Sequence, residues 1–207
     1  MKDKTKTIQT ILLLGALWGV CEAGIGYALH FLPPGFSGML MVPIGFYFMF
    51  NAYRQSGERT AVLWVGLIAA SVKLIDLLLP MRSPMGVINP VAAIMLESLL
   101  VFAFAKLYDR KQVFPPALLL GLSWMTLFTL AQALVLKPAS GLYLQPPYQI
   151  VSIVILNTLV GALLITLYLK TEALQLRQAP VRKDSFALPV FSLVLAFVLE
   201  LVNSLIV

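Results

Sequence analysis

The stretch IQTILLLGALWGVCEAGIGYALHFL, residues 8–32, decides the fold class of this chain. A helix that spans a bilayer needs about 20 predominantly apolar residues, and this run is longer than that. It is also longer than the apolar region of a secretory signal peptide, and no small-x-small cleavage site ends it cleanly. The sequence therefore predicts that this first segment is an uncleaved membrane helix.

Further apolar runs follow along the chain, and with Ile8–Leu32 they predict seven membrane helices. They are Gly35–Tyr53, Ala61–Leu79, Val87–Tyr108, Phe114–Leu136, Tyr148–Lys170 and Phe186–Val207. In hydrocarbon only helices and closed barrels satisfy the backbone, and these runs are too long and too uniformly apolar for barrel strands. We expect an all-α, polytopic membrane helix bundle that forms a single transmembrane domain over residues 1–207. Six helices are the alternative, mainly because the second run is short.

The composition agrees with a membrane protein. Of the 207 residues, 60% are hydrophobic and only 12% are charged, whereas a soluble domain has about 45–50% apolar and about 25% charged residues. The formal net charge is +6, but the basic residues lie in short loops between apolar runs. We interpret them as topology signals and contacts to anionic lipid, not as a surface for nucleic acid. Cys21 is the single cysteine, so no intrachain disulfide forms.

The distribution of lysine and arginine predicts the orientation. With a cytoplasmic N-terminus, the inner segments contain twelve basic residues and the outer loops contain two, Arg82 and Lys137. The twelve are Lys2, Lys4, Lys6, Arg54, Arg59, Lys106, Arg110, Lys111, Lys170, Arg177, Arg182 and Lys183. Cytoplasmic loops carry an excess of Lys and Arg. We therefore predict a multi-pass protein of the cell membrane, a bacterial inner membrane, with its N-terminus inside and its C-terminus outside.

Ionisable residues inside the apolar runs are the candidate site. Glu22, Lys73, Asp76, Glu97 and Glu200 fall on four predicted helices, and an ionisable group at membrane depth is by default a functional hypothesis. With a rise of about 1.5 Å per residue, all five share one depth band between the membrane centre and the outer leaflet. They predict one polar cavity that opens outward. Four acids and one base favour a cationic or hydrogen-bond-donating ligand; the alternative is polar contacts that hold helices together.

Two more side chains are candidates for the same ligand site. Trp18 lies one turn below Glu22 on the first predicted helix. Asn89 precedes Pro90 near the start of the fourth, where a broken helix could present free backbone groups to a ligand. We expect Asn89 to be the N-cap of that helix, with Pro90 at its first position, and both roles are compatible.

Small residues recur at four-residue spacing on the first predicted helix, at Gly15, Gly19 and Ala23. This spacing allows close helix packing, either within the chain or against a separate membrane subunit. In this feature, and in size, short loops and the expected outward-facing cavity, the chain resembles the substrate-binding S components of energy-coupling factor (ECF) transporters. The resemblance implies a protein that binds a micronutrient from outside and docks onto a coupling membrane subunit with two ATPases. Vitamin S components usually have six helices, whereas seven are predicted here.

The leading functional prediction is a transport or binding protein for a small solute. A proton-coupled secondary transporter, with Glu22, Glu97 or Glu200 as proton carriers, is the second hypothesis. An intramembrane enzyme that uses carboxylates as acid and base is the third. The sequence has no Walker A loop and no H-E-x-x-H motif, and it predicts no catalytic residue, metal ligand or cofactor.

Overall fold

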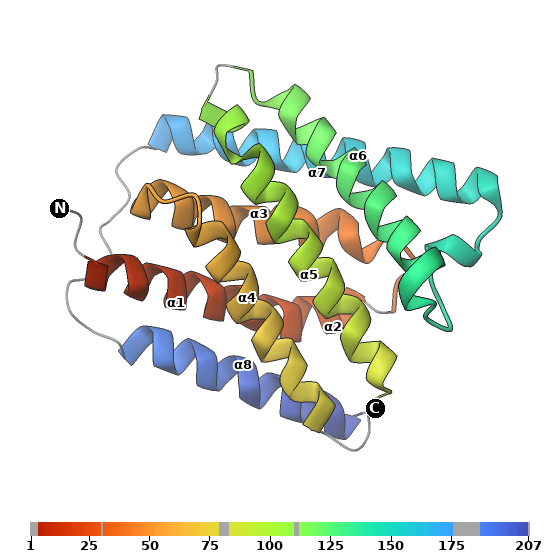
Figure 1. The fold of residues 1–207 in the computed structure, drawn as a ribbon, viewed down its shortest axis with the longest axis horizontal. Helices are drawn as coiled ribbons and strands as arrows, with labels where there is room; N and C mark the ends of the chain where they lie inside the picture. The colour runs from red at the N-terminus through yellow and green to blue at the C-terminus, as the bar shows by residue number, and fades with distance from the viewer. Residues whose placement is uncertain (1–3, 30, 79–82, 110–111, 176–186, 207) are drawn as a thin grey trace.

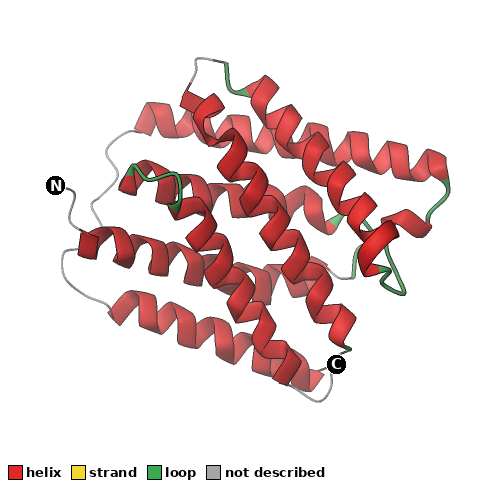
Figure 2. Cartoon of the chain, in the orientation of Figure 1, coloured by secondary structure: helices red, strands yellow, loops and turns green. Residues whose placement is uncertain are grey.

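The computed structural model describes residues 4–29, 31–78, 83–109, 112–175 and 187–206. These residues form helices and short connections, and no strand occurs among them (Figure 2). The long helices are α1 (Lys4–Cys21), α3 (Ser37–Ser56), α4 (Ala61–Leu74), α5 (Pro84–Phe104), α6 (Phe114–Ala131), α7 (Pro147–Gln175) and α8 (Ala187–Ile206). The predicted all-α bundle is confirmed, and these helices coincide with the seven predicted apolar runs.

Turns of a different pitch extend several of these helices. The segments η1 (Glu22–Gly26) and η4 (Gln132–Leu136) are π-helices that continue α1 and α6, and η1 leads into the short α2 (Tyr27–Leu29). The 3₁₀ segments are η2 (Ile75–Leu78) after α4, η3 (Ala105–Asp109) after α5 and η5 (Leu142–Leu144) before α7. Single π-helical turns occur often at functional sites. Both π segments therefore direct attention to the residues that they carry.

Among the residues that the structure describes, five helices are long and apolar enough to cross a membrane. These five lie within Lys4–Gly26, Ala61–Leu78, Pro84–Tyr108, Phe114–Leu136 and Pro147–Thr171. The helix α3 is less apolar because its last two turns carry Asn51, Arg54 and Gln55, and the apolar part of α8 is the shorter stretch Ala187–Val202. Several residues used to predict the orientation lie outside the described residues, namely Lys2, Arg82, Arg110, Lys111, Arg177, Arg182 and Lys183.

The helices form two crossed layers (Figure 1). In one layer α8, α1, α3 and α7 lie side by side in that order, and each contacts the next. In the other layer α4, α5 and α6 cross the first at an angle, with α4 over α1 and α3 and with α6 against α7. The connections from α2 to α3, α4 to α5 and α6 to α7 therefore all lie at one end of the bundle.

The start of α5 differs from the predicted one. Ser83 is the N-cap, its Oγ accepts a hydrogen bond from the Gly86 N–H at 3.2 Å, and Pro84 occupies the first turn. The prediction of Asn89 as N-cap was therefore wrong, because Ser83 and Pro84 supply the same signals earlier in the chain. Pro90 lies inside α5, where the missing N–H leaves the Gly86 carbonyl without its helical donor.

Close approach between the layers depends on glycine. Trp18 is fully buried where α1, α3 and α4 meet. A Cβ built on Gly45 of α3 would lie 2.6 Å from Trp18 Cζ2, and one on Gly66 of α4 would overlap the Ser98 side chain of α5. The surrounding core contains Phe46, Met49, Phe50, Val62, Val65, Ile94 and Leu120.

The Gly66 contact gives a test of this packing. We expect Gly66→Ala to lower the free energy of unfolding by about 1–3 kcal/mol, because the added methyl overpacks the α4–α5 contact. Gly24→Ala is the matched control, since no atom lies within 4 Å of a Cβ at Gly24. Thermal or denaturant unfolding in detergent measures both variants. Equal stability of the two would contradict the α4–α5 packing.

Candidate functional site

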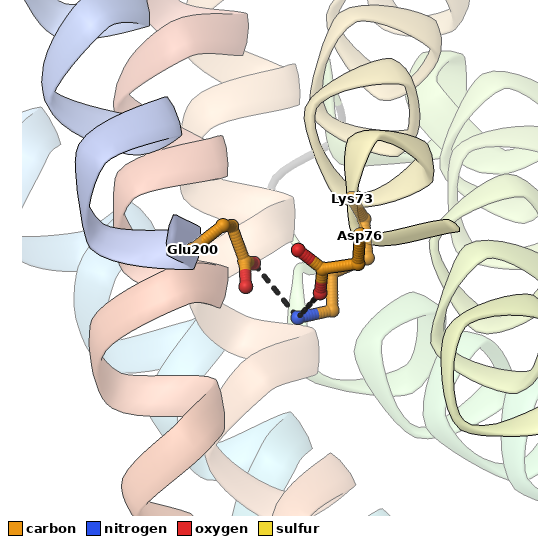
Figure 3. A network of polar contacts seen from close by, with 3 residues as sticks. All are labelled: Lys73, Asp76 and Glu200. Carbon is orange, nitrogen blue, oxygen red and sulfur yellow. Dashed lines mark hydrogen bonds and ion pairs between the residues drawn. The ribbon is translucent and has the colours of Figure 1, made fainter. Parts of the chain in front are cut away.

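A buried ion-pair cluster joins α4 to α8. The Lys73 ammonium donates a hydrogen bond to Glu200 Oε1 at 2.7 Å and lies 3.0 Å from Asp76 Oδ2 (Figure 3). Lys73 lies in the last turn of α4, and Asp76 lies three residues later in η2. Side chains three residues apart on a helix are neighbours, so the Asp76 carboxylate reaches the ammonium. Glu200 joins this pair from 127 residues away.

The cluster is almost completely buried. Lys73, Asp76 and Glu200 are 4%, 0% and 1% exposed. The Lys73–Asp76 contact has the distance of an ion pair but lacks the geometry of a hydrogen bond. Asp76 Oδ1 and Glu200 Oε2 have no hydrogen-bond partner among the described residues, and the two carboxylates point toward one another (Figure 3). Two acids therefore share one base in a site without solvent.

Glu22 lies beside this cluster at the first position of the π-helix η1. It is half-buried, and it interacts electrostatically with Lys73 and with Glu200. A Cβ on Gly26 would lie 3.1 Å from Glu22 Oε2. The glycine thus leaves room for the carboxylate where the helix widens.

Glu97 lies on α5, and it and Trp18 both contact Gly45 of α3. Its Oε1 occupies the space where a Cβ on Gly45 would lie, in contact with the same glycine as the Trp18 ring. Glu97 is 3% exposed and Trp18 is fully buried, and both Glu97 Oε1 and Trp18 Nε1 lack a hydrogen-bond partner among the described residues. Glu97 also interacts electrostatically with Glu22. The predicted acids thus form one neighbourhood around α1.

A cavity of about 700 Å³ lies elsewhere, at the end of the bundle where α2, α5, α6 and η5 meet. Its polar lining comes from Ser37, Ser83, Asn89, Thr129, Gln132 and Ser140, and its apolar lining includes Phe31, Met85, Trp124 and Phe128. None of the described residues that line it is charged. Of the predicted site residues only Asn89 lines it, so the buried acids and this cavity are separate places.

An amide pair spans the cavity wall. Gln132 Nε2 donates a hydrogen bond to Asn89 Oδ1 at 3.0 Å and so links η4 to α5. Gln132 is 5% exposed, at the first position of the second π-helix. The bond leaves the Asn89 –NH₂ group and a second Gln132 N–H for other partners. Gln132 is a polar residue inside the apolar run Phe114–Leu136. Its proximity to Asn89 depends on the tertiary fold.

The small residues of α1 pack inside the molecule. A Cβ on Gly15 would lie 2.8 Å from Ile68 Cβ, and one on Gly19 would lie 3.1 Å from Val72 Cγ2, both on α4. Ala23 is fully buried. Of the two roles predicted for these small residues, these contacts correspond to packing within the chain. The helix α4 covers Gly15 and Gly19, on the face where a partner subunit was the other possibility.

Five apolar helices of spanning length, with four acids and one lysine placed among them, indicate a polytopic helical membrane protein. Comparison of the chain with family models, with curated proteins and with solved structures found no match.

The ion-pair cluster predicts a strong effect of removing its base. We expect Lys73→Met to lower the free energy of unfolding by about 3–5 kcal/mol at neutral pH, because it leaves two buried acids without a cation. Lys106→Met is the matched control: Lys106 is exposed, and such substitutions usually change stability by less than about 0.5 kcal/mol. Unfolding of both variants in detergent gives the comparison. A Lys73→Met protein as stable as the control variant would contradict the buried pair.

Proposed function

We propose that this chain crosses the bilayer seven times, with its N-terminus in the cytoplasm, and binds a small solute in the cavity at the outer end of the bundle. The excess of basic residues in the segments predicted to lie inside, twelve against two in the outer loops, supports this orientation. It places the connections around the cavity, which follow α2, α4 and α6, on the outside. The cavity of about 700 Å³ lies within the usual size range of small-molecule sites, about 300–1,000 Å³.

The lining of the cavity carries the proposal about the solute. Ligand sites combine an apolar wall with a few placed polar groups, and here the Asn89–Gln132 amide pair is set among aromatic side chains, methionines and prolines. Because no described lining residue is charged, the site favours an uncharged solute that exchanges hydrogen bonds with the two amides. Of the two predicted solute classes, cationic and hydrogen-bond-donating, this lining favours the hydrogen-bond-donating class.

The resemblance to ECF S components supports the same function, because it also places solute binding on the outer side. A coupling membrane subunit with ATPases is the partner that this resemblance implies. Because Gly15 and Gly19 contact α4, such a partner would use another surface of the bundle. Solute binding by Glu22, Glu97 and Glu200 stays a competing prediction, which the experiment below separates from binding in the cavity.

The experiment uses the full chain, purified in mild detergent and examined by native mass spectrometry for bound small molecules. We expect an uncharged solute on the wild-type protein and none on Gly86→Leu. Gly86 lines the cavity, and a Cβ there would contact Ser83 Oγ, at 3.2 Å. The leucine side chain would therefore fill part of the cavity. Gln132→Leu removes about one hydrogen bond, worth about 1.4 kcal/mol, and weakens binding of that solute about tenfold.

Gly24→Leu is the control, because Gly24 is also an exposed helical glycine with open space around it. Equal retention of the solute by Gly86→Leu and Gly24→Leu would contradict binding in the cavity. A cationic solute that is lost from Glu22→Gln or Glu97→Gln, and kept by Gly86→Leu, would instead support binding at the acids.

A further inference from the structure

The Lys73–Asp76–Glu200 cluster has one more acid than it has bases, and solute binding in the cavity does not use it. We propose that this cluster is a proton-binding site, in which Asp76 and Glu200 share one buried proton beside the Lys73 ammonium. The proton is held between the two carboxylates, of which Asp76 Oδ1, Asp76 Oδ2 and Glu200 Oε2 lack a hydrogen-bond partner among the described residues. This inference is independent of the function proposed for the cavity.

Hydrogen-bond accounting supports the shared proton. Buried polar atoms are nearly always paired. Among the described residues, however, both Asp76 carboxylate oxygens and Glu200 Oε2 accept no hydrogen bond, in side chains that are 0% and 1% exposed. Figure 3 shows the two carboxylates pointing toward one another across the ammonium. Two ionised carboxylates so placed repel each other, whereas one proton turns the same arrangement into a donor and an acceptor. A single proton therefore satisfies one oxygen of each carboxylate.

Charge accounting supports the same conclusion. With all three groups ionised the cluster carries one net negative charge, and an unpaired charge at membrane depth costs several kcal/mol. With one proton the cluster is neutral. Binding transfers H⁺ from bulk water to a carboxylate oxygen, forms one O–H bond and breaks no bond in the protein.

A metal ion fits this position less well than a proton. The ammonium already occupies the cation position, 2.7 Å from Glu200 Oε1 and 3.0 Å from Asp76 Oδ2, and it would repel a second cation. In the part of the chain that the structure describes, no group of three or more His, Cys, Asp or Glu side chains is arranged to hold a metal ion. A proton needs only the facing pair of oxygens.

The ionisable groups that interact with Glu200 come from three of the elements that pack against α8. They are Lys73 of α4, Asp76 of η2 and Glu22 of η1, while Glu97 of α5 acts on Glu22. Glu200 of α8 accepts the hydrogen bond that Lys73 of α4 donates. Loss of the proton therefore leaves an excess negative charge at the contact between α8 and α4.

Infrared spectroscopy of the full chain in detergent tests the proton directly. We expect a carbonyl stretch from a protonated carboxylic acid in the wild-type spectrum, with a shift in D₂O. Other buried acids, such as Glu97, can absorb in the same region, so each variant is compared with the wild type by a difference spectrum. The same carboxylic-acid band is lost in Glu200→Gln and in Asp76→Asn, because both acids share one proton. Glu97→Gln, the matched control at a buried acid outside the cluster, keeps that band. A difference spectrum of either Glu200→Gln or Asp76→Asn without that lost band would overturn the proposal.

Thermal unfolding at neutral pH keeps the proposal testable if one variant folds poorly. Gln at position 200 still accepts the Lys73 hydrogen bond and leaves a neutral Lys73–Asp76 pair. The midpoint of Glu200→Gln therefore stays equal to that of the wild type or rises, whereas Lys73→Met falls. A Glu200→Gln midpoint as low as that of Lys73→Met would show a fully ionised network. A rise in the wild-type midpoint on adding Na⁺, absent in Glu200→Gln, would show a metal cation in place of the proton. Either result overturns the proposal.

Discussion

Neutralising the buried Lys73 ammonium is the constraint on which the arrangement of α8 depends. An ammonium that is 4% exposed in an apolar bundle needs a counter-charge within reach. Asp76 supplies one counter-charge from η2, which continues α4. Glu200 supplies a second counter-charge from α8, at 2.7 Å. Apart from this contact α8 presents mainly apolar residues. Apolar packing between helices has little driving force in lipid, so the polar contact specifies where α8 sits on α1 and α4.

Small residues make room for the buried acids. Glu97 Oε1 and Trp18 both occupy space that a side chain at position 45 would fill, and Glu22 Oε2 lies against Gly26. The layers therefore approach closely at the positions where polar groups are enclosed. A lone Glu can serve as contact between helices, but here glycine, indole and carboxylate are fitted to one another around α1. The cavity lies at the end of the bundle, so the buried acids and the cavity occupy different places in the molecule.

Much of the fold could be predicted from the sequence, because helix length and apolarity in lipid are local properties. The run Phe114–Leu136 has the same ends in the structure as in the sequence, and Lys73 and Asp76 pair because they are three residues apart. Glu200 could not be assigned to Lys73, since its approach depends on how α8 packs on α1. The cavity lined by Asn89 and Gln132 could not be predicted for the same reason, because the two amides meet only in the tertiary fold. The start of α5 lies earlier than predicted, because Ser83 caps it.

The most direct test of the ion pair is a magic-angle-spinning NMR measurement in lipid bilayers. The dipolar coupling between Lys73 Nζ and the Glu200 carboxyl carbon reports their separation, and Glu200→Gln identifies the carbon signal. A contact of 2.7 Å between Nζ and Oε1 predicts a strong coupling that is present in the folded protein at neutral pH. Resolved signals from both groups without a measurable coupling would contradict the buried cluster and the position of α8.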